Sequence, residues 1–219
     1  MRPLRLAAAL LAPFALATAI PAFADCKEEV LSALDKQRKA TGFRMETTMV
    51  SEQGPVKMLV EYMPPDRMRQ VVTVVVSPVP VESILVGGKA WGKDGDTWKP
   101  LAADIAAEMV TQLDETLGDD RGTIGTVACL GSTAIDNLEL MAYRVENDAQ
   151  VGPQDRSPDA EAKARAALAD EARPLRMFYI DQKTGLPMRS VFARANKLDK
   201  PIFKATYTYP ADIKIEAPK

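Results

Sequence analysis

The chain has 219 residues, with 28 basic and 30 acidic side chains, two cysteines, ten methionines and no histidine. The lack of histidine excludes nucleophilic triads built on histidine and zinc sites with histidine ligands. A net charge of −2 gives no electrostatic footprint for DNA or RNA. With 47% hydrophobic and 26% charged residues, the chain is expected to fold around a core as one domain.

Residues 1–24 have the pattern of a secretory signal peptide. Arg2 and Arg5 supply a positive start, an uncharged apolar stretch follows, and Ala22-Phe23-Ala24 places small residues around a cleavage site. A transmembrane anchor is the alternative, but the apolar stretch is short for a bilayer. We therefore expect cleavage after Ala24 and export to the periplasm.

The mature chain would begin at Asp25, next to Cys26. A lipoprotein signal would need a small residue at that place, and a charged aspartate does not suit it. The mature chain would carry a net charge of about −4, and no later segment is long and apolar enough to span a membrane. We expect a monomer that needs no cofactor.

Cys26 and Cys129 both belong to the exported part of the chain. Disulfides persist in oxidising compartments, so the two cysteines are expected to pair, and two unrelated buried thiols are the alternative. Cysteines this far apart do not form a redox motif, and two thiolates are too few for a structural zinc site.

The mature chain starts with a predicted helix over residues 25–41, in which Val30, Leu31 and Leu34 recur at helical spacing. The pattern then changes to the alternation of strands, interrupted by tight turns such as Asp94-Gly95-Asp96. This succession predicts an antiparallel meander. The expected strands lie at residues 43–49, 58–62, 67–76, 81–86 and 89–93 and around Trp98.

A second helix is predicted over Leu101 to Leu117. The glycines after it do not form a phosphate-binding loop, because neither GxxxxGK[ST] nor GxGxxG is present, and they indicate turns around a strand that contains Cys129. An Ala-rich segment at 148–172 is expected to be an insertion, either a solvated surface element or a lid over a cavity. The remaining strands are expected at 137–146, 174–180, 186–194, 202–209 and 212–216.

Few residues in this sequence suggest catalysis. Asp94 with Asp96, and Asp119 with Asp120, lie in turn-like contexts where aspartate serves the backbone. The DGD sequence is too short for a calcium-binding loop. We therefore expect no enzyme, no catalytic residue and no metal site.

Nine methionines lie in the mature chain, several of them on neighbouring strands. At any single position a methionine can simply fill the core. Methionine is also flexible and polarizable, so methionines on successive strands favour an apolar cavity that adapts to its ligand.

Several segments, in this order, resemble the LolA-like superfamily of exported lipoprotein carriers, lipoprotein receptors and mycobacterial lipid-binding lipoproteins. They are VEYMPPDRMRQVV at 60–72, ILVGGKAWGKDGDTWKPL at 84–101, YIDQKTGLPMRSVF at 179–192 and ATYTYPADIKIEAP at 205–218. The elements that carry the resemblance are Tyr62, Pro64, Pro65 and Arg67, the GKAW hairpin, and Asp181, Thr184, Gly185, Leu186 and Pro187.

The resemblance implies an α+β fold in which a curved antiparallel sheet forms a half-open barrel, with helices covering its concave face. It also implies a carrier or sensor that holds a lipid-like or acylated ligand in an apolar cavity. Strand parity and the resemblance assign to this cavity Met45, Met58, Val60, Tyr62, Met68, Trp91, Met177 and Tyr179.

A protein-interaction module with a filled cavity is the alternative, in which an envelope protein docks at a sheet edge or at the insertion.

Overall fold

The computed structural model describes residues 25–51, 54–74, 77–118, 124–146, 174–194, 197 and 200–218. The predicted signal peptide and the Ala-rich insertion lie outside the described residues. The elements in chain order are α1 (Cys26–Arg38), β1 (Phe43–Ser51), β2 (Gly54–Met63), β3 (Arg67–Val74), β4 (Ser77–Val86), β5 (Lys89–Asp94), β6 (Thr97–Pro100), α2 (Ala103–Leu117), β7 (Thr126–Ile135), β8 (Leu138–Glu146), β9 (Pro174–Asp181), β10 (Pro187–Arg194) and β11 (Phe203–Thr208).

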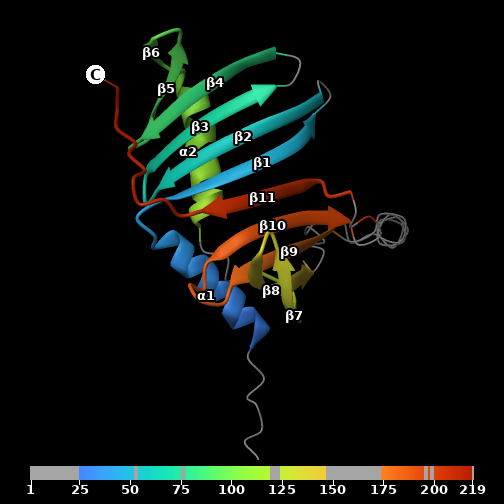
Figure 1. Cartoon of the computed structure of the whole chain (residues 1–219). Coiled ribbons are helices and arrows are strands. Elements are labelled where there is room, and N and C mark those ends of the chain that lie inside the picture. The colour runs from blue at the N-terminus through green and yellow to red at the C-terminus, as the bar shows by residue number, and fades with distance from the viewer. Residues whose placement is uncertain are drawn as a thin grey trace, which may run out of the picture.

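All the described strands belong to one antiparallel sheet, in the order β6-β5-β4-β3-β2-β1-β11-β10-β9-β8-β7 (Figure 1). Two meanders, β1 to β6 and β7 to β11, meet where the first strand pairs with the last. The sheet is not closed, because β6 and β7 are edge strands at opposite ends. The predicted antiparallel meander is confirmed.

The first helix begins where the sequence predicts it. The Asp25 side chain accepts hydrogen bonds from the backbone N–H groups of Lys27 and Glu28, which have no partner inside the helix. Acidic residues occupy the first turn and basic residues the last, as the helix dipole favours.

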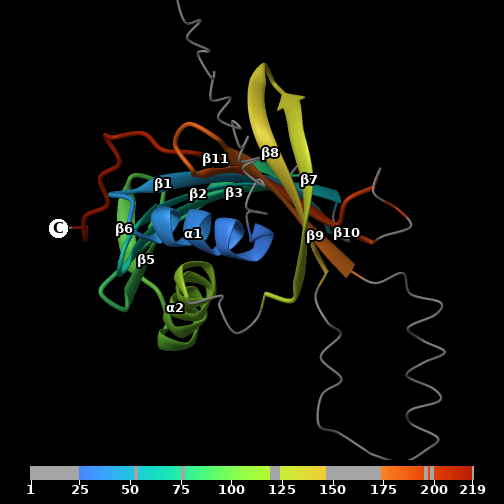
Figure 2. The same cartoon turned by 90° about the horizontal axis from the view of Figure 1, so that it is seen from below.

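Both helices lie on the same side of the sheet (Figure 2). We call this side the helix-covered face and the other side the open face. Two packed clusters join helices to sheet on the helix-covered face. One joins Ala106, Met109 and Leu113 of α2 to residues of β1 to β5 and β11, and the other joins α1 to β8 and β9.

A row of charged side chains crosses five strands on the open face. Arg44 of β1 and Arg69 of β3 both contact the Glu61 carboxylate of β2, at 2.7 and 3.0 Å. Arg69 also contacts Glu82 of β4 at 2.7 Å, and Lys93 of β5 lies 3.3 Å from the same carboxylate. These cross-strand pairs stabilise the pairing of β1 to β5.

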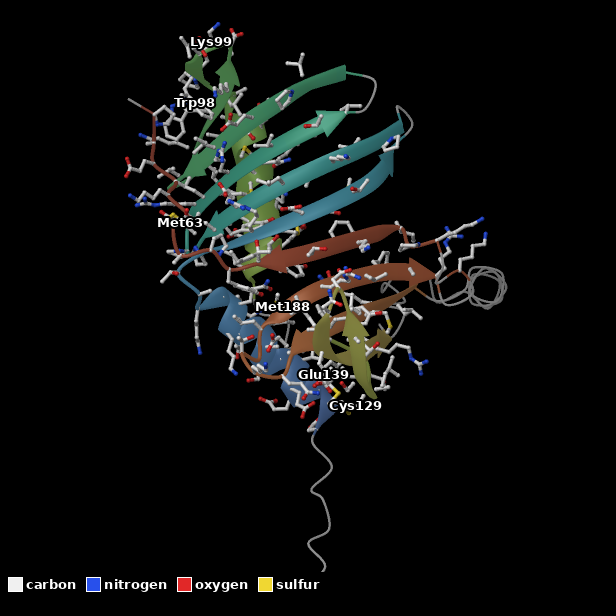
Figure 3. The ribbon with its side chains drawn as sticks, viewed as in Figure 1. Met63, Trp98, Lys99, Cys129, Glu139 and Met188 are labelled. Atoms are coloured by element: carbon white, nitrogen blue, oxygen red, sulfur yellow. A yellow bond between two sulfur atoms is a disulfide. The ribbon has the colours of Figure 1, made fainter. Side chains whose placement is uncertain are left out.

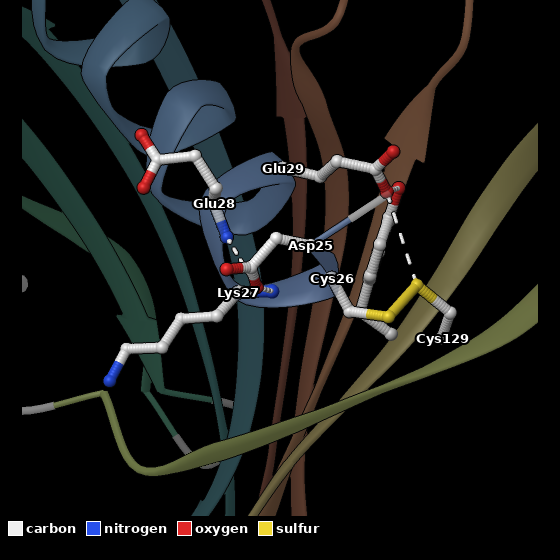
Figure 4. The surroundings of a disulfide bond; sticks show 7 residues. Asp25, Cys26, Lys27, Glu28, Glu29 and Cys129 are labelled. Atoms are coloured by element: carbon white, nitrogen blue, oxygen red, sulfur yellow. Dashed lines mark hydrogen bonds between the residues drawn. A yellow bond between two sulfur atoms is a disulfide. The ribbon is translucent and has the colours of Figure 1, made fainter. Parts of the chain in front are cut away.

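The predicted disulfide between Cys26 and Cys129 is present (Figure 4). It joins the first residue of α1 to β7, with 5.5 Å between the two Cα atoms. Next to it, the Glu29 carboxylate accepts a hydrogen bond of 2.6 Å from the Tyr143 hydroxyl of β8. The start of α1 is therefore attached to the β7–β8 end of the sheet by a covalent bond and a charged hydrogen bond.

The strand predicted at residues 212–216 does not form. This segment runs as coil, although Ile215 is buried with 1% of its surface exposed. The Ile215 carbonyl accepts a hydrogen bond from the Arg67 guanidinium, and its N–H donates to the sulfur of Met63. The alternation of apolar residues there reflects this side-chain anchoring, because these backbone groups bond to side chains instead of a neighbouring strand.

Candidate ligand-binding surface

Five of the eight predicted cavity residues lie on the helix-covered face, since their strand register places them on the same side as Phe43 and Leu85. Four of them belong to the cluster packed against α2 and are at most 8% exposed. These four are Met45, Val60, Tyr62 and Met68. Side chains of α2 fill the space over them, so these residues form core.

Tyr62 is fully buried under α2 and stacks on Phe43, with 4.7 Å between the ring centroids. Burial raises the pKa of its hydroxyl to about 12, although Thr116 and Gln112 of α2 lie close enough to oppose the shift. The phenol is therefore neutral at physiological pH, and its position supports packing of α2 on the sheet.

Three predicted cavity residues, Trp91, Met177 and Tyr179, lie on the open face. Trp91 pairs with Ile84, whose side chain points away from α2. Met177 pairs with Arg144, and Tyr179 with Ala142, both on the open face. The structure therefore does not bring these three residues together with the other five. Alternation divides a strand into two sets of side chains, but it does not say which set faces the helices.

Apolar side chains also continue along the helix-covered face beyond the cluster packed on α2. The register aligns them across β2, β3, β10 and β11, and all are only partly buried. We call this surface the apolar strip, and its members are Val56, Met58, Val72, Val74, Phe192 and Phe203. Only Met58 and Phe203 contact the cluster, while the other four belong to neither packed cluster of the described residues.

Thr47 of β1 lies at the inner end of the apolar strip, between Met58 of β2 and Ala205 of β11. It is 5% exposed, and among the described residues its hydroxyl has no hydrogen-bond partner. A buried hydroxyl without a partner is unusual, because losing its bonds to water costs about 1–3 kcal/mol. The sequence alone indicates no role for Thr47.

A groove of about 780 Å³ crosses β3, β2, β1 and β11 on the open face. Its side chains are mixed in character: Lys57 and Lys204 lie in one row with Thr48 between them, and Leu59 and Val71 supply apolar contacts. The groove therefore offers polar and apolar surface in similar measure.

A second groove, of about 570 Å³, runs between α1 and the strands β8 and β9. Its lining includes the apolar residues Met141 and Ile180 and the carboxylates of Glu28, Glu29 and Asp181. The pKa of the Asp181 carboxyl is lowered, chiefly because it accepts a hydrogen bond from the backbone N–H of Thr184. These carboxylates stabilise the helix start and a turn, which accounts for them without a ligand.

The described residues contain no group of three or more His, Cys, Asp or Glu side chains placed to hold a metal ion. In the described part of the chain, neither helix combines the length and the apolar character needed to cross a bilayer. Asp94 forms an ion pair with Lys99. The hydrogen bond that Lys99 donates to the Asp94 carboxylate lowers the pKa of this carboxyl. Asp119 and Asp120 lie outside the described residues.

Comparisons of this chain with known proteins give different results for its sequence and for its structure. No model of a protein family matches the sequence, and no curated protein matches it. Solved structures do match. LprF from Mycobacterium bovis is 15% identical over 88% of this chain and 96% of its own, with a TM-score of 0.56. The Mycobacterium tuberculosis lipoprotein LppX is 13% identical over 87% of this chain and 98% of its own, with a TM-score of 0.55.

The chain has a LolA-like fold. The predicted fold class is confirmed: a large antiparallel sheet that does not close, with helices on one face. The sequence did not predict most of the apolar strip on this LolA-like sheet as a binding surface. The valine-rich run at 71–76 indicates an apolar surface in this region. The run includes residues of both faces of the sheet, and the sequence does not show which of them lie on the helix-covered face.

Proposed function

We propose that this protein is an exported carrier or sensor whose apolar strip binds the acyl chain of a lipid-like ligand. The observation that carries the proposal is the alignment of partly exposed apolar side chains from four strands on the face that also holds the helices. Soluble proteins rarely leave a continuous apolar surface without a function.

The physics of such a site needs no catalytic residue. Burying an acyl chain against the strip would contribute roughly 0.8 kcal/mol for each CH₂ group removed from water. The strip combines valine and phenylalanine with the flexible side chain of Met58, so it can adjust to chains of different length and branching.

Two further observations support export and a carrier role. The disulfide between Cys26 and Cys129 is expected in an oxidising compartment such as the periplasm. The LolA-like fold is shared with proteins that the sequence resembles, and that resemblance implies lipid or lipoprotein carriage, with an envelope protein as a further partner.

Adjacent valines on one strand give a sharp test. Val72 lies on the apolar strip, whereas Val71 lies on the open face and lines the groove there. We expect Val72→Glu to weaken binding of a fluorescent palmitoyl probe at least tenfold, because the bound palmitoyl chain would remove the new glutamate carboxylate from water. Val71→Glu serves as the matched control and should bind the probe like the wild type.

The reverse result, with Val71→Glu losing the probe and Val72→Glu keeping it, would move the site to the open-face groove and refute the proposal. Native mass spectrometry of protein purified from its own envelope provides an independent check. We expect copurified lipid, whereas an empty chain that also takes up no palmitoyl probe would favour a protein-interaction module.

A further inference from the structure

Packing alone does not explain why a threonine stands at position 47 on the helix-covered face. Valine would fill the same volume between Met58 and Ala205 without burying a hydroxyl. The hydroxyl has no partner among the described residues, so it does not stabilise the fold as it stands. A buried, unpaired donor at the end of an apolar strip is therefore a candidate contact for a ligand.

Gln70 of β3 provides a second, independent observation beside the same methionine. It pairs with Val60, so its side chain lies on the helix-covered face diagonally from Met58. Among the described residues, its amide nitrogen contacts only the Met58 sulfur, at 3.6 Å, and sulfur is a weak acceptor. Within the part of the chain that the structure describes, two donors, one on each side of Met58, thus lack an oxygen acceptor.

Several other polar groups on this face do have partners. The Ser190 and Tyr207 hydroxyls lie 3.0 Å apart, within hydrogen-bond distance, and Tyr209 donates to the Pro187 carbonyl at 2.6 Å. Among the described residues, the Tyr62 hydroxyl under α2 is the other buried hydroxyl of this face without a partner, so such hydroxyls occur both under α2 and at the end of the apolar strip at Met58.

We propose that the ligand carries a carbonyl oxygen next to its acyl chain and that Thr47 donates a hydrogen bond to this oxygen. The inference rests on the proposed function, and it narrows the ligand class to acyl esters and amides, as opposed to hydrocarbons and ethers. The chain would lie on the apolar strip with its carbonyl at the inner end, and the Gln70 amide would be a second donor to the same polar group.

The test compares two lipids of matched length that differ in this carbonyl: 1-palmitoylglycerol, an ester, and 1-O-hexadecylglycerol, an ether. Thr47→Val removes the hydroxyl and keeps the shape, and Thr47→Ser keeps the hydroxyl. Thr48→Val makes the same change one residue along the strand, on the open face. Affinities are measured by isothermal titration with the mature protein, and urea unfolding checks that each variant is folded.

We expect Thr47→Val to weaken binding of the ester about five- to tenfold and to leave binding of the ether unchanged. Thr47→Ser and Thr48→Val should bind the ester like the wild type. If Thr47→Val binds both lipids as the wild type does, or weakens both equally, the hydrogen bond is refuted while acyl binding stands. If the wild type binds neither lipid, the proposed function fails and this inference fails with it.

Discussion

Glu61 shows how a single residue on the open face is held as an ion. The residue is 6% exposed, and its carboxylate contacts Arg44 and Arg69. Burial alone would raise the pKa of Glu61, but the hydrogen bonds and charges of the two arginines outweigh burial and hold the pKa below its ordinary value of 4.5. The charged form is therefore the stable one in the folded protein.

We predict that Glu61→Gln lowers the free energy of unfolding by about 1–2 kcal/mol at pH 7, because two arginines lose a charged partner. A lowered pKa in the folded state contributes stability above the unfolded value and loses it as the pH falls. The difference in the free energy of unfolding between the wild type and Glu61→Gln should therefore be largest above pH 4.5 and shrink progressively below it. Urea titrations at a series of pH values measure this difference.

Glu46 provides the matched control for this experiment. Glu46 belongs to β1 and lies on the open face, as Glu61 does. It is exposed, and it forms no ion pair with the described residues. Glu46→Gln should change the free energy of unfolding by less than about 0.5 kcal/mol. An equal loss in both variants would show that the contacts of Glu61 have no special role.

At the scale of elements, α1 depends on its attachment to the end of the sheet. Its apolar residues pack on β8 and β9, and Cys26 fixes its first turn to β7. The helix is short, and helices of this length are marginal in isolation, so packing and the disulfide must hold it in place.

We predict that replacing both cysteines, Cys26→Ser with Cys129→Ser, lowers the free energy of unfolding by up to about 4–5 kcal/mol. The disulfide closes a loop of 103 residues, and cross-linking such a loop restricts the unfolded chain. Urea midpoints measure the loss, and hydrogen exchange should show protection lost in α1 before α2.

Dithiothreitol should lower the midpoint of the wild type and leave that of the double variant unchanged. A wild-type midpoint that does not respond to the reductant would mean that the disulfide contributes nothing to stability.

At the scale of the whole molecule, the pairing of β1 with β11 makes one sheet from two meanders. The same junction carries core residues of both, since Tyr207 and Ala205 of β11 belong to the cluster packed on α2. Trp98 and Cys129 lie at opposite ends of this sheet (Figure 3). Signals from the two ends can therefore report whether the sheet unfolds as a unit.

We predict that urea unfolding followed by tryptophan fluorescence and by far-ultraviolet circular dichroism gives the same midpoint. Both tryptophans lie on β5 and β6, so fluorescence reports the end far from the disulfide. Reduction at the other end should shift the fluorescence midpoint as well. Separate midpoints, or a fluorescence midpoint that ignores reduction, would indicate that the two meanders unfold independently.

Much of the fold could be predicted because local patterns carry it. Helical spacing in α1 and α2, the alternation in β1 to β5 and the turn glycines each follow from rules of a few residues. The candidate site could be predicted only in part. Val71 and Val72 are adjacent and identical in type, yet one lies in a polar groove and the other on the apolar strip.

The sequence by itself determined the type and order of the described helices and nearly all the strands, the antiparallel meander, the pairing of the two cysteines and the resemblance to LolA-like proteins. Only the tertiary structure decided which side of the sheet the helices cover, and with it that Trp91, Met177 and Tyr179 face away from Met58. The reason is that period-two alternation is symmetric between faces, and only the packing of α1 and α2, distant in sequence, breaks that symmetry.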